Sequence, residues 1–145
     1  MGYAKEFNHL EYNVPEFLLT DAGWEDVSWH NDVCPRWENR DLYIAVWVDC
    51  NELACREYED WKQYTVAPII VQFDGSTLIG DETLFSTERA DVLLSWIQMY
   101  EIKQYIELAI AIGNHMEEQP EEVADGLVST LEWLNVYMAP DGEPC

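Results

Sequence analysis

Tyr64–Gly80, YTVAPIIVQFDGSTLIG, decides the fold class, because this stretch predicts a β-hairpin. Its first part, 64–73, is rich in β-branched and aromatic residues, which favour strands. A tight turn is predicted at 74–76 (DGS) and a short returning strand at 77–80. Pro68 cannot donate a hydrogen bond to a neighbouring strand, so we expect the first strand to lie at a sheet edge or to carry a bulge there.

Further strands are predicted ahead of this hairpin. Leu42–Asp49 (LYIAVWVD) is apolar on both faces and rich in β-branched and aromatic residues, as a central strand would be. Asp26–His30 is a second candidate strand, and Asn51–Trp61 predicts a loop with one helical turn. The first half of the chain is therefore predicted to form a sheet.

The second half of the chain has helical periodicity instead. Apolar residues recur at helical spacing from the N-cap residues Ser86 and Thr87 to Gly113, with a candidate break near Glu101. A last helix is predicted over 120–140, between two prolines. Together the elements predict the α+β class: one acidic domain over residues 1–145, in which two or three helices pack on one face of an antiparallel sheet of three to five strands.

The charge of the chain is extreme for a sequence that should fold. It holds 29 Asp and Glu against 7 Lys and Arg, for a formal net charge of -22, while 48% of its residues are hydrophobic and 7 are Trp. Disordered acidic chains lack such apolar content, so we expect a compact body with a negative surface. A charge of -22 matches the phosphates of about 37 Å of duplex DNA, roughly the width of a small domain. The expected partner is therefore a basic nucleic-acid-binding protein or ribonucleoprotein complex.

Composition also excludes some partners. The basic residues are scattered singly from Lys5 to Lys103, without a basic patch that contains aromatic residues, so we expect no direct binding of DNA or RNA. Met1–Leu10 lacks the pattern of a secretory signal, and no apolar run is long enough to span a membrane. A soluble cytoplasmic protein with no membrane partner is expected.

The cysteines allow two interpretations. His30, Cys34, Cys50 and Cys55 have the spacing H-x3-C-x15-C-x4-C, which overlaps the spacings of structural zinc sites. Against a zinc site, the last pair lacks the glycine of a zinc knuckle, and small buried cysteines are common in protein cores. We expect reduced thiols and no metal or other cofactor, with the zinc site as the alternative.

No catalytic motif is present. His30 lies near Asp32, a pairing suited to acid–base chemistry, but no Ser on a strand-to-helix turn accompanies them as a nucleophile. Phosphate-binding, dinucleotide-binding, zinc-protease and EF-hand motifs are also missing. We therefore expect a protein that is not an enzyme.

The acidic residues are the expected binding surface. They recur along the chain, and no Lys or Arg follows Gln104 to compensate them. A surface that serves only solubility mixes both signs of charge, whereas a salt-adapted protein would also be this acidic, and that alternative stays open. The candidate partner-binding residues are Glu25, Asp26, Asp32, Glu57, Glu59, Asp60, Glu117, Glu118, Glu121, Glu122 and Asp125.

Small size, extreme acidity and an ordered composition without a catalytic motif make the chain resemble phage- and plasmid-borne anti-defence proteins, among them DNA-mimicking anti-restriction proteins and acidic anti-CRISPR proteins. Asp26–Pro35 (DVSWHNDVCP) is also similar to segments of small phage and plasmid proteins. The resemblance implies an inhibitor in the host bacterial cytoplasm. It would bind the basic DNA channel of a CRISPR effector complex, or of a restriction enzyme, and block target DNA binding as a DNA mimic.

Two other functions stay open at this point. One is an acidic immunity or adaptor protein that neutralises a basic partner such as a nuclease toxin. The other is a small zinc protein that uses His30, Cys34, Cys50 and Cys55. The sequence also leaves open the oligomeric state, the identity of the target and the acidic cluster that binds it.

Overall fold

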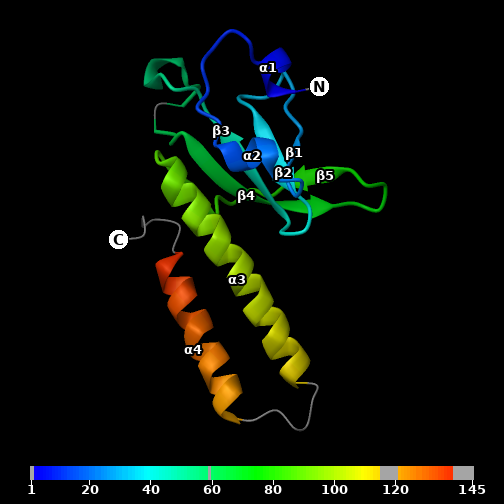
Figure 1. Ribbon diagram of the computed structural model, residues 1–145. Helices are drawn as coiled ribbons and strands as arrows, with labels where there is room; N and C mark the ends of the chain where they lie inside the picture. The colour runs from blue at the N-terminus through cyan, green and yellow to red at the C-terminus, as the bar shows by residue number, and fades with distance from the viewer. Residues whose placement is uncertain (1, 59, 115–120, 139–145) are drawn as a thin grey trace. The chain divides into compact units, whose positions relative to one another are not determined.

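A computed structural model of the chain describes residues 2–58, 60–114 and 121–138 (Figure 1). Its contacts separate two compact units, Met1–Ala90 and Asp91–Cys145. The first unit holds the sheet, and the second holds nearly all of two long helices. The predicted α+β class is confirmed, whereas the single-domain organisation stays a prediction.

The sheet of the first unit is antiparallel and runs in the order β1-β2-β3-β4-β5, with β6 also pairing with β4. The predicted strands at 42–49 and 64–73 are confirmed as β3 and β4, and the returning strand of the hairpin is β5. Six strands form this sheet in the described part of the chain, where three to five were expected. They are β1 (Glu25–Asp26), β2 (Arg36–Asn39), β3 (Ile44–Val48), β4 (Tyr64–Val71), β5 (Thr77–Ile79) and β6 (Phe85–Thr87).

The strand predicted over Asp26–His30 is much shorter, because β1 ends at Asp26. The Asp26 Oδ1 accepts a hydrogen bond from the backbone N of Ser28 at 3.0 Å, and this Asx turn redirects the chain. β2 was not predicted, since two of its four residues, Arg36 and Glu38, are charged. Nevertheless β2 pairs with β3 along its whole length.

Pro68 lies in the middle of the sheet, so the expectation of an edge strand was wrong. β3 pairs along one side of β4, while β6 and β5 pair with its two ends on the other side. Ile69 donates its N–H to the Tyr43 carbonyl on the β3 side, so the nitrogen of Pro68 faces the gap between β5 and β6. Gly80 N donates to the Pro68 carbonyl at 2.8 Å within that gap. The proline therefore occupies a position where no ladder donor is required.

One face of the sheet carries the core of the first unit. A row of buried residues crosses β2, β3, β4 and β6, and each of them is 1% exposed or less: Trp37, Val46, Val66 and Phe85. The ring of Tyr3 in α1 (Tyr3–Glu6) lies 5.3 Å from that of Trp37. α2 (Glu16–Thr20) buries Leu18. The helical turn predicted within 51–61 is the 3-10 helix η1 (Leu53–Cys55).

The second unit contains α3 (Ala90–Asn114) and α4 (Glu121–Tyr137), which run side by side in opposite directions (Figure 1). Near the start of α3, Trp96 Nε1 donates to the Met138 carbonyl just beyond α4. α3 is continuous, so the candidate break near Glu101 is not observed. Ser86 and Thr87 lie in β6 rather than at the helix start, although Thr87 Oγ1 still accepts from the N of Arg89. The prolines at 120 and 140 lie outside the described residues.

Candidate functional site

The face of the sheet opposite the core is hollowed into a pocket of about 330 Å³. Trp47, Thr65 and Ser86 lie opposite one another on β3, β4 and β6, and the turn before β4 and the 80–83 segment add to the lining. We term it the Trp47–Trp61 pocket. Its lining residues are Val33, Trp47, Asp60, Trp61, Lys62, Thr65, Ala67, Ile79, Gly80, Asp81, Glu82, Thr83 and Ser86.

The walls of the pocket are largely apolar and aromatic. Trp47 is half-buried, and its ring already carries a cation: the Arg36 guanidinium carbon lies 4.9 Å from the ring centroid. Trp61 is 37% exposed, and its ring lies 4.7 Å from that of Tyr58. The pocket therefore offers tryptophan surface of the kind that binds flat apolar or cationic groups.

Three carboxylates line the same pocket and are exposed to solvent. Asp60 precedes β4, whereas Asp81 and Glu82 belong to the connection between β5 and β6. The fold brings them together although about 20 residues separate the two segments. Lys62 is the single cation of the lining and takes part in contacts of its own. The pocket thus combines aromatic walls with a net negative charge.

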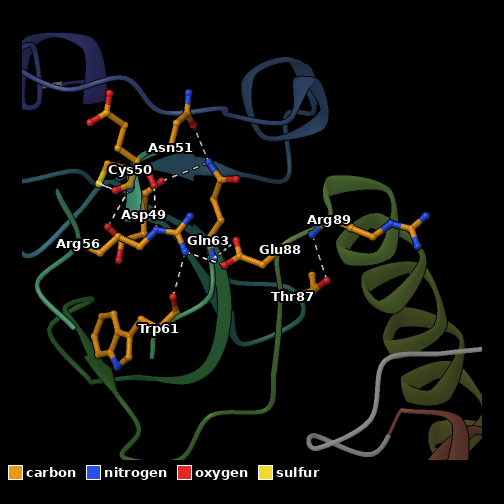
Figure 2. A network of polar contacts seen from close by, with 10 residues as sticks. Asp49, Cys50, Asn51, Arg56, Trp61, Gln63, Thr87, Glu88 and Arg89 are labelled. Atoms are coloured by element: carbon orange, nitrogen blue, oxygen red, sulfur yellow. Dashed lines mark hydrogen bonds and ion pairs between the residues drawn. The ribbon is translucent and has the colours of Figure 1, made fainter. Parts of the chain in front are cut away.

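A buried arginine fixes the wall that carries Trp61 (Figure 2). Arg56 follows η1, and its side chain is 3% exposed. Its Nη1 donates to the Trp61 carbonyl at 3.0 Å and to Glu88 Oε1 at 2.7 Å, while its Nε donates to the Cys50 carbonyl at 2.9 Å. The guanidinium therefore joins the end of β3, the 51–63 loop and the residue that follows β6.

The pairing of Arg56 with Glu88 determines the charge state of both groups. The hydrogen bond from Arg56 lowers the pKa of Glu88, whose second oxygen accepts from the backbone N of Gln63 at 3.1 Å. Burial alone would lower the pKa of Arg56, but the hydrogen bond and charge of Glu88 raise it. Both groups are ionised at neutral pH, so the loop is held by charge-assisted hydrogen bonds.

A second part of this network surrounds Asp49 at the end of β3 (Figure 2). Asp49 is 4% exposed, and its Oδ1 accepts from the N of Cys50 at 2.8 Å. Its Oδ2 is buried without a hydrogen-bond partner in the described residues. Burial raises the pKa of this carboxyl, against the opposing effect of the Cys50 hydrogen bond and the Arg56 charge. Asp49 is thus a destabilising group within an otherwise paired network.

The acidic residues predicted in the first unit have different surroundings. Glu25, Glu57 and Asp60 are exposed, and Asp32 is half-buried. Asp26 is engaged inside the fold, because its Oδ2 accepts from the N of Tyr3 at 2.8 Å. Of these residues, Asp60 lines the pocket. Asp81 and Glu82 were not predicted from sequence, because only strand pairing brings them close to Asp60.

The remaining predicted acidic residues lie at position 59 and from position 117 onward. Glu59, Glu117 and Glu118 lie outside the described residues. Glu121, Glu122 and Asp125 lie in the first turns of α4. Their assignment to a partner-binding surface stays a prediction.

The predicted zinc ligands are not assembled into a metal site. His30 Nδ1 lies 2.7 Å from Glu6 Oε2 instead, and Cys34 is fully buried, which raises the pKa of its thiol. Cys50 and Cys55 line a second pocket, of about 370 Å³, together with His9. Over residues 2–58, 60–114 and 121–138, no group of three or more His, Cys, Asp or Glu is placed to hold a metal ion. The zinc alternative therefore loses its geometric basis.

Three arginines of the first unit make contacts with other residues of that unit. Arg56 is buried with Glu88, and Arg36 lies over Trp47. Arg40 Nη2 donates to the Gly75 carbonyl at 2.8 Å, which ties down the β4–β5 turn. Exposed carboxylates of this unit occur in α2 and in most of the loops: Glu11, Glu16, Asp21, Asp41, Glu52, Glu57, Asp60, Asp74, Asp81 and Glu82. Arg56 is thus the buried cation among the three arginines, whereas Lys5, Arg40, Lys62 and Arg89 are exposed. Exposed carboxylates outnumber these exposed cations, although Glu38 and Asp49 are buried.

Comparison with known proteins gives no relative: no family model, curated protein or solved structure matches the chain. Within the described ranges, no helix is both long and apolar enough to cross a membrane.

Proposed function

We propose that this protein inhibits a bacterial nucleic-acid-targeting defence complex, as an anti-CRISPR protein that occupies the DNA-binding channel and blocks target DNA. The observation that carries the proposal is that exposed carboxylates outnumber exposed cations on the first unit. The exposed cations of this unit are Lys5, Arg40, Lys62 and Arg89, whereas exposed carboxylates occur throughout the unit, most of them on loops. Such a surface attracts basic sites and repels nucleic acid.

Carboxylates suit this role because arginine recognises a carboxylate with the same geometry as a phosphate. An arginine donates two parallel hydrogen bonds to either group. Effector complexes hold DNA through Lys and Arg contacts to the phosphate backbone. Each exposed ion pair contributes only about 0 to 1 kcal/mol, so inhibition requires several pairs and an aromatic anchor. The Trp47–Trp61 pocket supplies both kinds of group in one place.

A DNA-displacement experiment tests the proposal. Guide-loaded, DNA-targeting CRISPR effector complexes are bound to a fluorescent target duplex, and anisotropy is followed as the protein is added. We expect the duplex to be displaced by one class of effector. We also expect affinity for that effector to fall at least tenfold between about 50 and about 200 mM salt. An unrelated folded protein of similar net charge is the control for a general polyanion effect.

Two results would overturn the mimicry. One is a ternary complex in which the protein and the duplex are bound together, because a mimic must exclude DNA. The other is binding that does not change with salt, because charge pairing is screened as ionic strength rises.

A further inference from the structure

The Trp47–Trp61 pocket has the chemistry of a receptor for one long cationic side chain. Its volume, about 330 Å³, is at the lower end of the range for small-ligand sites. Its apolar walls suit the methylene stem of a lysine or arginine, and its exposed carboxylates Asp60, Asp81 and Glu82 suit the charged end. An anionic ligand would be repelled by the same carboxylates.

The tryptophans favour arginine over lysine. A guanidinium stacks on an aromatic face and donates in a planar fork to carboxylates, whereas an ammonium is a more strongly hydrated point charge. The Arg36 guanidinium carbon already lies over the Trp47 ring, 4.9 Å from its centroid, so this ring contacts an arginine within the fold. Trp61 adds a second aromatic wall that the Arg56 hydrogen bond at 3.0 Å holds in place.

We infer that the Trp47–Trp61 pocket binds an arginine side chain of the basic protein partner, as the anchor of the interface. This inference rests on the proposed function for the identity of the partner, but the pocket chemistry is independent of it. The arginine occupies a position where, in the partner's own complex, a DNA phosphate is bound. Asp60, Asp81 and Glu82 replace the phosphate oxygens, and the two tryptophans supply apolar contact that a phosphate lacks.

The pocket is tested with the intact chain and blocked tripeptides. Acetyl-glycyl-arginyl-glycinamide is compared with its lysine and citrulline counterparts, since citrulline has nearly the shape of arginine without its charge. Binding is followed by NMR through the indole N–H signals of Trp47 and Trp61, which the single substitutions W47F and W61F assign. We expect millimolar binding of the arginine peptide, weaker binding of the lysine peptide, and at least about tenfold weaker binding of the citrulline peptide.

A matched pair of triple variants separates the pocket from general charge. D60N/D81N/E82Q removes three exposed carboxylates of the pocket, and E11Q/E16Q/D41N removes three exposed carboxylates that do not line it. Both variants change the net charge equally and leave the buried residues untouched. We expect the first to weaken binding of the arginine peptide about tenfold and the second to weaken it less than twofold.

The outcomes distinguish the pocket from the proposed function. Equal binding of the arginine and citrulline peptides, or equal effects of the two triple variants, would overturn the arginine receptor. If D60N/D81N/E82Q displaced DNA from an effector with the same potency as the native chain, the role of the pocket as anchor would be overturned. The proposed inhibitor function would then stand. If the arginine peptide bound as expected but no effector lost its DNA, the proposed function would fail and the pocket assignment would remain.

Discussion

Arg56 and Glu88 are 32 residues apart in the sequence, yet Arg56 Nη1 lies 2.7 Å from Glu88 Oε1. The same nitrogen donates to the Trp61 carbonyl at 3.0 Å. One buried cation therefore fixes both the 51–63 loop and a wall of the Trp47–Trp61 pocket. Because Arg56 is enclosed while Glu88 is about half-exposed, the two partners contribute unequally to stability.

The variant Arg56→Met should be strongly destabilised. Methionine fills part of the volume but leaves the Cys50 and Trp61 carbonyls without their donor. We expect a loss of about 2–4 kcal/mol in the free energy of unfolding, measured by urea denaturation. Glu88→Gln is the matched control, with an expected loss of about 1 kcal/mol, because water can solvate the half-exposed end of Glu88. A larger loss for Glu88→Gln than for Arg56→Met would contradict this account.

Asp49→Asn should stabilise the protein at neutral pH, since it removes a buried charge whose Oδ2 has no partner in the described residues. Burial raises the pKa of Asp49 in the folded state above its ordinary value of 3.8. The folded state therefore binds the proton more tightly, and the native chain loses stability as pH rises from 3.8 through the raised pKa. The difference in unfolding free energy between Asp49→Asn and the native chain should be largest above this pH window and smallest below it. Urea denaturation from acid to neutral pH measures it, and a gap that does not change with pH would contradict the assignment.

The strands β3 and β4 could be predicted from sequence because local composition and burial agree in them. Leu42–Asp49 and 64–73 are apolar and β-branched, and both become central strands. β2 could not be predicted, since Glu38 is buried at 2% exposure and is stabilised by the Thr77 hydroxyl at 2.7 Å, a partner from a distant strand. The tertiary contact, not the local pattern, makes this segment a strand.

The site was only partly predictable for the same reason. The acidic segment around Asp60 was visible as a charge cluster, but its neighbours Asp81 and Glu82 reach it only through the pairing of β4 with β5 and β6. Trp61 was one of several tryptophans with no sequence signal to separate it from the core. Arg56 was hidden as a single basic residue in an acidic loop. A positive charge in so acidic a segment is the one signal that could have indicated a structural role.

Gly80 and Gly126 should respond in opposite ways to substitution by alanine. A Cβ at Gly80 would lie 2.6 Å from the Pro68 Cγ, so Gly80→Ala forces apart the chains that meet at the centre of β4. We expect Gly80→Ala to lose about 1–3 kcal/mol of unfolding free energy. Gly126 lies inside α4, and a Cβ there meets nothing within 4 Å, so Gly126→Ala should gain about 0.5–1 kcal/mol from helix propensity. Denaturation followed by circular dichroism measures both, and equal effects would contradict the crowding at Pro68.

Glu25 and Asp26 are adjacent carboxylates that should have different roles. Asp26 accepts hydrogen bonds from the backbone nitrogens of Tyr3, at 2.8 Å, and Ser28, at 3.0 Å, so it connects α1 to β1. Asp26→Ala should cost about 1–3 kcal/mol of unfolding free energy, because two backbone donors lose their acceptor. Glu25 is exposed, and Glu25→Ala should change stability by less than about 0.5 kcal/mol. Urea denaturation of the two variants under identical conditions tests this difference.

The stability of the Asp26→Ala variant decides whether Asp26 is assigned to the fold or to the proposed binding surface. If Asp26→Ala is as stable as the native chain, its two hydrogen bonds contribute little, and the half-buried carboxylate stays a candidate for the proposed binding surface. If Asp26→Ala is destabilised as expected, a loss of partner binding in that variant results from the weakened fold and not from the missing charge. Glu25→Lys is then the informative change, since it reverses an exposed charge without touching those bonds. Under the proposed function it should weaken DNA displacement at low salt and have less effect as salt screens the interaction.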